Sequence, residues 1–171
     1  MQPRTRMLSA LTLGTAMAFG AAAIAADMPK EGTYDDEYAA YGTSKATAIG
    51  KERVLVSFEN NGLWLSKGFG NHMTWHCFGL TDITSGMEQF HGYCVGTDPN
   101  GDQLVGDFAS VGKFPADAKS ADGKLTFTTG TGKYAGISGG GTFTCHGSEF
   151  RTAVEGTSAE YCTNSGSYKI P

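Results

Sequence analysis

Residues 76–108 read HCFGLTDITSGMEQFHGYCVGTDPNGDQLVGDF and contain two tight-turn signals between β-like runs. The Ser85–Gly86 pair suits a two-residue hairpin, because glycine readily adopts the positive φ that such turns require. With this turn, the numbers of directly opposed residues sum to 171, so Cys77 lies opposite Cys94. Opposed Cβ atoms of an antiparallel pair are close enough for a disulfide. The first turn therefore predicts a Cys77–Cys94 disulfide across two neighbouring strands.

The Asn100–Gly101 pair marks a second hairpin, since Asn-Gly is the dipeptide most typical of a tight β-turn. Opposed residues then sum to 201, which aligns three aromatic residues side by side on three strands. Because side chains alternate between the two faces of a sheet, these rings and the disulfide lie on opposite faces. We expect the rings to face the core or a cavity. The candidate ligand-binding residues are this row and the histidines at its edges: His76, Phe78, His91, Tyr93 and Phe108.

The chain has four cysteines, all of them after the N-terminal apolar segment. An even number of cysteines in an exported protein indicates disulfides. With Cys77 assigned to Cys94, elimination pairs Cys145 with Cys162. A zinc site would need closely spaced C-x-x-C-like pairs, which this sequence lacks. We therefore expect two disulfides and no metal.

The N-terminal residues have the pattern of a secretory signal peptide. Two arginines precede an apolar segment of small residues from Met7 to Ala26, and Ala23 and Ala25 form an A-x-A site. We expect a signal peptide over residues 1–25, and cleavage after Ala26 is nearly as favourable. A membrane anchor is the alternative, but the segment is short and rich in alanine and glycine. A periplasmic or secreted protein, with no membrane span in its mature chain, is the favoured interpretation.

The mature chain is acidic. Removal of the signal peptide leaves 11 basic and 17 acidic residues, a net charge of −6. Such a surface repels phosphate backbones and anionic membranes, so nucleic acid is not an expected partner. Residues 26–40 are polar and include an acidic cluster, which predicts a flexible N-terminal arm. Residues 41–171 are long enough for a single domain with its own core.

This domain consists of short β-like runs separated by glycine, asparagine and aspartate. No segment shows the period and caps of a convincing helix, although residues 113–122 have room for one short helical turn. Regularly spaced strands of this kind are typical of a barrel or a sandwich. The expected strands are Tyr41–Ala48, Arg53–Asn60, Leu63–Ser66, Met73–Asp82, Gln89–Gly96, Leu104–Gly112, Lys124–Thr128, Gly141–Cys145, Arg151–Ser158 and Ser167–Ile170.

Two stretches carry a family resemblance. Residues 92–143 contain GYCVGTDPNGDQLVGDF and GKLTFTTGTGKYAGISGGGTF, and residues 43–62 read TSKATAIGKERVLVSFENNG. They resemble the bacterial allene-oxide-cyclase-like barrel proteins, distant relatives of plant allene oxide cyclases and of dirigent proteins. The resemblance implies an all-β fold, an eight-stranded antiparallel β-barrel with an interior pocket, and assembly into a homo-oligomer. No catalytic residue of the plant cyclases aligns with this chain, so none is carried over.

Other motif-like stretches are better explained by structure. The run GTGK at residues 130–133 fits neither phosphate-binding glycine pattern, and we interpret it as a turn or bulge before a strand. The stretch DPNGD at residues 98–102 lacks the spacing of a calcium loop, which favours a hairpin turn. No nucleophile motif is present, and disulfides leave no reactive cysteine. We expect no cofactor and no covalent catalysis.

Three functions remain open at this point. The favoured one is a non-catalytic exported barrel that binds a small apolar or amphipathic molecule against the aromatic row. The first alternative is an isomerase or cyclase that bends a substrate inside the pocket, with His76, His91 and Tyr93 as polar participants. A titratable group buried beside a ligand-sized cavity would favour this enzyme. The second alternative is a structural or interaction module of the cell envelope with a filled barrel interior.

Overall fold

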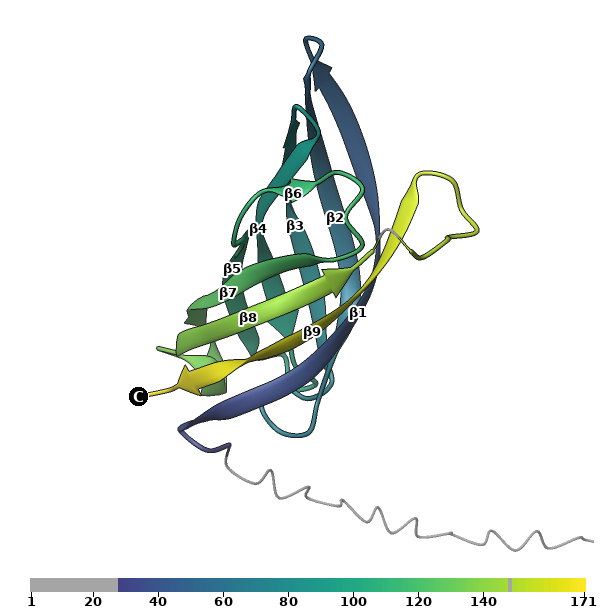
Figure 1. Cartoon of the computed structure of the whole chain (residues 1–171). Helices are drawn as coiled ribbons and strands as arrows, with labels where there is room; N and C mark the ends of the chain where they lie inside the picture. Colours follow the sequence, from purple (N-terminus) through teal and green to yellow (C-terminus); the bar gives the residue numbers. More distant parts are fainter. Residues whose placement is uncertain (1–27, 148) are drawn as a thin grey trace, which may run out of the picture.

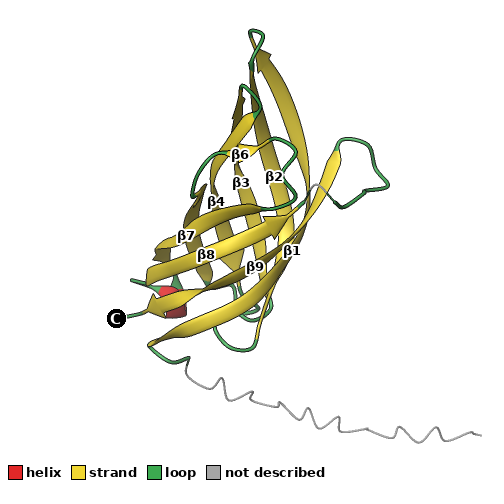
Figure 2. Ribbon diagram, viewed as in Figure 1, coloured by secondary structure: helices red, strands yellow, loops and turns green. Residues whose placement is uncertain are grey.

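The computed structural model describes residues 28–147 and 149–171. The expected signal peptide, residues 1–25, lies outside the described residues. The described chain is all-β apart from one 3-10 turn (Figure 2). The elements are β1 Glu31–Ile49, β2 Arg53–Ser66, β3 Met73–Thr84, β4 Met87–Thr97, β5 Gln103–Ser110, β6 Phe114–Pro115, β7 Ala121–Gly130, η1 Gly132–Tyr134, β8 Ser138–His146 and β9 Thr157–Lys169.

Eight of these strands close into an antiparallel barrel (Figure 1). The order is β3-β2-β1-β9-β8-β7-β5-β4, and β4 pairs back onto β3. The two-residue strand β6 pairs with the start of β4. The hairpin of β1 and β2 extends beyond the other strands. The fold class expected from the sequence is therefore confirmed.

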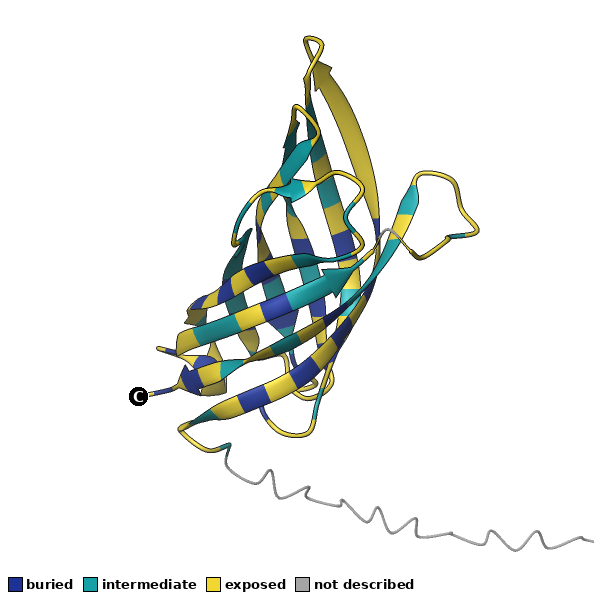
Figure 3. Ribbon diagram, in the orientation of Figure 1, coloured by how far each residue is buried: buried dark blue, intermediate teal, exposed yellow. Residues whose placement is uncertain are grey.

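A two-residue alternation of buried and exposed positions builds the barrel (Figure 3). In β1, Tyr34, Asp36, Tyr38 and Ala40 are buried, while the residues between them are exposed. Successive side chains of a strand point to opposite faces, so one set fills the barrel and the other faces solvent.

The first hairpin has the predicted register. Ser85 and Gly86 both have positive φ, 52° and 75°, as a two-residue hairpin turn of this type requires. Cys77 pairs with Cys94 across β3 and β4, and the two form a disulfide. Cys145 and Cys162 form the second disulfide across β8 and β9. Both predicted pairings are confirmed.

The second hairpin differs from the prediction by one residue. Its turn has three residues, Pro99 to Gly101, because Asp98 and Asp102 still pair through their backbones. The Asp98 carboxylate accepts the backbone N–H groups of Asn100 and Asp102, and Gly101 has a φ of 88°. Opposed residues therefore sum to 200, as in the pair of Gly92 with Phe108.

This shift places Phe108 on the face opposite to Phe78 and Tyr93, with which it was expected to form one row, since a one-residue slip exchanges the two faces of a strand. The interior face of the barrel was also assigned wrongly. Cys77 is only 3% exposed, whereas Phe78 is 42% and Tyr93 is 43% exposed. The disulfides thus lie inside the barrel, and Phe78 and Tyr93 lie outside.

Glycines explain why the cysteine face is the inner one. A Cβ on Gly79 would lie 2.7 Å from Cζ of Phe58, and one on Gly92 would lie 2.6 Å from Cζ of Phe108. The missing side chains make room for inward rings from the neighbouring strands. A glycine-rich face next to large rings is therefore the core face here.

Three further expectations are corrected. Residues 31–40 are not a flexible arm, because they form the first half of β1 and pair with both β2 and β9. Residues 151–156 are a loop, and β9 begins at Thr157. Residues 113–122 contain β6, a loop and the first two residues of β7 instead of a helical turn; the 3-10 turn lies at Gly132–Tyr134.

The GTGK run is part of a structural clamp, as the interpretation of a turn predicts. The Lys133 ammonium lies 2.5 Å from the buried Asp98 carboxylate, and the backbone N–H of Lys133 donates to Asp102. A Cβ on Gly132 would overlap the Asp102 carboxylate. The clamp fixes η1 to the hairpin between β4 and β5.

Candidate ligand-binding cavity

One end of the barrel interior is filled by aromatic side chains. Phe69 stacks on Tyr168 with ring centroids 4.0 Å apart, and Trp64 stacks on Trp75 at 4.6 Å. The two tryptophans also line an open cavity of about 420 Å³. The stacked Trp64–Trp75 pair therefore separates the filled end of the barrel from the cavity.

The walls of this cavity are mainly apolar. Phe58, Phe90, Phe108 and Phe143 contribute rings from four different strands. Their nearest centroids lie 6.1 to 6.3 Å apart. The size is that of small-molecule sites, which range from about 300 to about 1,000 Å³. The interior is thus an aromatic chamber of ligand size.

A hydrogen-bonded chain of three polar side chains crosses the wall of the cavity. The Tyr38 hydroxyl donates to Asn60 Oδ1 at 2.7 Å, and Asn60 Nδ2 donates to Glu160 Oε1 at 2.7 Å. The strands β2, β1 and β9 are neighbours in the sheet, which brings these side chains together. Burial raises the pKa of Glu160, and the hydrogen bond from Asn60 partly offsets this. Burial also raises the pKa of Tyr38.

Both disulfides line the same cavity. The Glu160 carboxylate lies within 4.8 Å of the sulfurs of Cys145 and Cys162, with the spacing of a metal site. The two sulfurs are bonded to each other, so they are not thiolate ligands. With the disulfide formed, this cluster offers a metal ion a single ligand, the Glu160 carboxylate.

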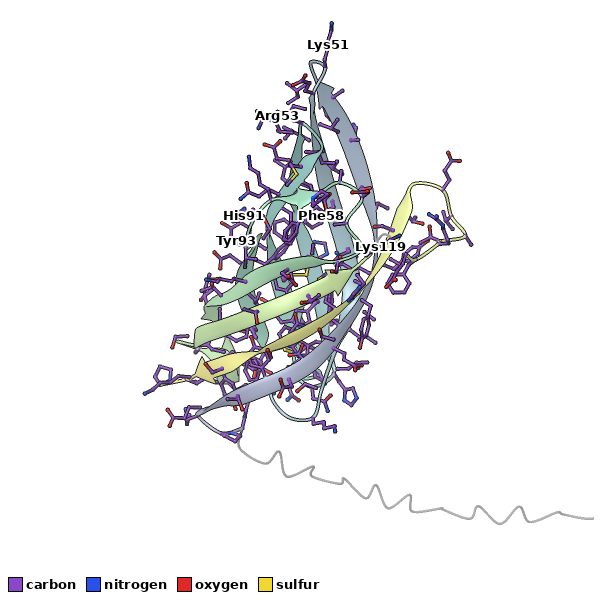
Figure 4. All side chains as sticks on the ribbon, viewed as in Figure 1. Lys51, Arg53, Phe58, His91, Tyr93 and Lys119 are labelled. Atoms are coloured by element: carbon purple, nitrogen blue, oxygen red, sulfur yellow. A yellow bond between two sulfur atoms is a disulfide. The ribbon has the colours of Figure 1, made fainter. Side chains whose placement is uncertain are left out.

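The mouth of the cavity is more polar than its walls. Among the described residues, the titratable side chains that line the whole cavity are Tyr38, Glu88, Lys119 and Glu160. Burial raises the pKa of Glu88. Lys119 is an exposed residue of the loop between β6 and β7 (Figure 4).

A second buried acid lies behind the cavity wall. Asp36 is 6% exposed, and its Oδ1 accepts a hydrogen bond of 2.6 Å from Asn164, a residue of the cavity lining. Its Oδ2 is buried as well. Burial raises the pKa of Asp36 to about 7, although the side chains of Asn164 and Trp64 act in the opposite direction.

The raised pKa of Asp36 predicts that Asp36→Asn increases the stability of the protein by an amount that depends on pH. Between the ordinary aspartate pKa of 3.8 and about 7, the unfolded chain loses a proton that the folded protein keeps, so wild-type stability falls as pH rises. Asparagine still accepts the Asn164 hydrogen bond. We expect Asp36→Asn to raise the free energy of unfolding by about 2 kcal/mol above about pH 7 and by about zero below about pH 4.

Urea unfolding across this pH range measures the difference between variant and wild type. Asp117→Asn is the control, because Asp117 is an exposed carboxyl group of the loop between β6 and β7, and it should change little at any pH. A stability gain of Asp36→Asn that is constant with pH, or absent near neutral pH, would contradict the raised pKa assigned to Asp36.

The structure keeps the five sequence-predicted site residues close together but divides them between two faces. His76, Phe78, His91 and Tyr93 form a row on the outer face, with centroids 5.5 to 6.2 Å apart along it. Figure 4 shows His91 and Tyr93 on the outer side of the barrel wall and Phe58 on its inner side. Phe108 alone of the five lines the cavity. Ligand binding by the outer row stays a prediction.

The fold and the site define a class: a closed eight-stranded β-barrel with an aromatic interior cavity and a buried carboxyl group. No family model and no curated protein matches the sequence. Among solved structures, the chain is similar to the pterocarpan synthase dirigent protein GePTS1, with a TM-score of 0.52 and 10% identity over 84% of this chain and 88% of that chain. At this identity the likeness shows the fold alone, and it confirms the eight-stranded barrel that the resemblance implied.

Two observations bear on where the protein works. Both cysteine pairs are disulfides, which are compatible with an extracellular or periplasmic location because they persist in oxidising compartments. The described part of the chain contains no helix with the length and hydropathy of a membrane span.

Proposed function

We propose that this protein is an exported barrel that binds one small apolar or amphipathic molecule in its interior cavity, without covalent catalysis. The observation that carries the proposal is the open chamber of about 420 Å³ bounded by four phenylalanine rings. Small barrels either fill their interior or hold one small ligand. An interior that is filled at one end and open at the other fits a barrel that holds one small ligand.

The composition of the cavity supports this proposal. Apolar rings provide the binding energy, at roughly 25 cal/mol per Å² of apolar surface removed from water. The hydrogen-bonded side chains of Tyr38, Asn60 and Glu160 add a polar cluster to the lining, which would fix the orientation of the ligand. The sequence resemblance also predicts a relationship to allene-oxide-cyclase-like proteins. It further predicts a homo-oligomer, which light scattering tests.

Energy transfer to a neutral apolar probe, N-phenyl-1-naphthylamine, tests the proposal. The chain has two tryptophans, and both line the cavity, so a probe in the chamber receives their excitation. We expect saturable transfer in the wild type. Val56→Phe narrows the chamber, because Val56 lines it, and should weaken probe binding at least about tenfold.

Leu55→Phe is the matched control, since Leu55 precedes Val56 on β2 and points to the other face. It should leave probe binding unchanged within about twofold. Absence of transfer in the wild type, or equal loss in both variants, would show that the interior is not the binding site.

A cyclase or isomerase is the second candidate, and Glu160 is the observation that favours it. This partly buried carboxyl group lines a cavity of ligand size, and desolvation raises its pKa, which is the direction that suits a general acid. Glu160→Gln separates the two functions. If the protein is an enzyme, this substitution should abolish turnover of a candidate substrate. If the protein only binds its ligand, the wild type should already release every bound molecule chemically unchanged.

A further inference from the structure

The interior around the cavity is acidic. Among the described residues, Glu160 and Glu88 line the cavity and the buried Asp36 lies next to its lining, whereas the buried Asp98 is paired with Lys133 at the hairpin between β4 and β5. No lysine or arginine is buried among the described residues. The lysine that lines the cavity, Lys119, is exposed. Acidic groups inside low-dielectric walls attract cations from solvent.

Among the described residues, Glu160 has one side-chain hydrogen-bond donor, Asn60, which donates to Oε1. Burial raises the pKa of Glu160, and no cationic side chain of the described residues lowers it. A buried carboxyl group without a cation is costly when ionised. A ligand that brings a positive charge would remove this cost and gain a charge-assisted hydrogen bond.

The surroundings of Glu160 suit an organic cation better than a metal ion. The neighbouring sulfurs are tied up in a disulfide, and four phenylalanine rings form the remaining apolar wall. Aromatic faces attract ammonium groups through cation–π interactions. A carboxylate in an aromatic chamber therefore offers both a counter-ion and a compatible lining to an alkylammonium group.

We propose that the ligand of the cavity is a hydrophobic amine, bound with its ammonium group against Glu160 and its apolar body among Phe58, Phe90, Phe108 and Phe143. This inference rests on the proposed binding function and names its ligand class. It selects against carboxylic acids of the same shape, because two carboxylates would meet in the chamber.

The proposal predicts that amine binding depends on pH. The titratable and charged groups that share the cavity with Glu160 are Tyr38 on β1, Glu88 on β4 and Lys119 at the mouth. Ionisation of Glu160 strengthens the attraction to an ammonium group. Ionisation of Glu88, and of Asp36 beside Asn164 of the lining, acts in the same direction. Lys119 opposes it weakly, since it is exposed and screened by solvent.

A series of three ligands with one body and different head groups tests the proposal: 4-phenylbutylamine, 4-phenylbutanol and 4-phenylbutanoate. Each is titrated against the complex with N-phenyl-1-naphthylamine, and displacement is followed by the loss of energy transfer from Trp64 and Trp75. At about pH 8 we expect the amine to bind about tenfold tighter than the alcohol, and the carboxylate to bind weakest. Between about pH 5 and about pH 8 the amine should gain affinity and the alcohol should not.

Glu160→Gln should remove the advantage of the amine, so that the amine and the alcohol bind the variant with affinities within about twofold of each other. Glu155→Gln, which removes an exposed carboxylate of the loop before β9, should retain the full advantage. If the Glu160→Gln variant fails to fold, the wild-type series and its pH dependence still decide the matter.

The outcomes separate this inference from the proposed function. If the probe binds and all three ligands displace it with equal affinity, or the carboxylate is strongest, the interior binds ligands but not as an amine site. If neither the probe nor any ligand binds, the proposed function itself is wrong. Amine selectivity that survives Glu160→Gln overturns the role of Glu160.

Discussion

Replacing Gly140 with alanine is expected to lower the free energy of unfolding by about 3 kcal/mol or more. Gly140 has a φ of 145°, and a Cβ at this position would overlap the backbone oxygen of Leu125 on β7. The added methyl group would meet rigid backbone, which cannot move aside without breaking the pairing of β7 with β8. Urea unfolding followed by tryptophan fluorescence measures the loss.

Gly112→Ala is the matched control for this substitution. Gly112 has no heavy atom within 4 Å of its would-be Cβ, and its φ lies outside the left-handed region. Alanine should be tolerated there and should add up to about 1 kcal/mol of stability, because it restricts the unfolded chain. Similar effects of the two substitutions would show that β7 and β8 are not packed as described.

Removing either disulfide should cost about 3 kcal/mol of unfolding free energy. Both disulfides join cysteines 17 residues apart, so both restrict the unfolded chain to a similar extent. The double variants Cys77→Ala/Cys94→Ala and Cys145→Ala/Cys162→Ala should therefore lose similar amounts of stability. Urea unfolding in the absence of reductant provides the measurement.

Reductant provides the control for the disulfide variants. Each double variant should lose further stability on reduction, because the other disulfide remains, and the combined four-fold variant should be insensitive. A wild-type protein whose stability is unaffected by complete reduction would contradict the contribution assigned to these bonds.

Local turn chemistry allowed part of the fold to be predicted from sequence. The Ser85–Gly86 turn fixed the pairing of β3 with β4, and with it both disulfides. The Asn100–Gly101 turn did not, because the Asp98 carboxylate holds two backbone N–H groups and closes a three-residue turn. The Asn-Gly dipeptide alone does not indicate that Asp98 caps the turn. The predicted register was therefore wrong by one residue, which exchanged the two faces of β5.

Non-local pairing accounts for the other errors. Residues 31–40 look like a polar arm because their inward positions include an aspartate and an alanine. Their strand is held by β9, more than 100 residues away in the chain. Likewise, Glu160 was missed because the expected strands were Arg151–Ser158 and Ser167–Ile170, so residues 159–166 had no predicted face, whereas β9 runs from Thr157 to Lys169. Once Cys162 is known to point inward, the two-residue period places Glu160 and Asn164 inward as well.

The central claim is that a ligand binds in the interior cavity of the barrel. Two-dimensional nuclear magnetic resonance during titration with 4-phenylbutanol tests this most directly. We predict shifts of the indole N–H signals of Trp64 and Trp75 and of the backbone signals of Phe108 and Glu160. Shifts confined to His76, Phe78, His91 and Tyr93, with both indole signals unchanged, would contradict the account.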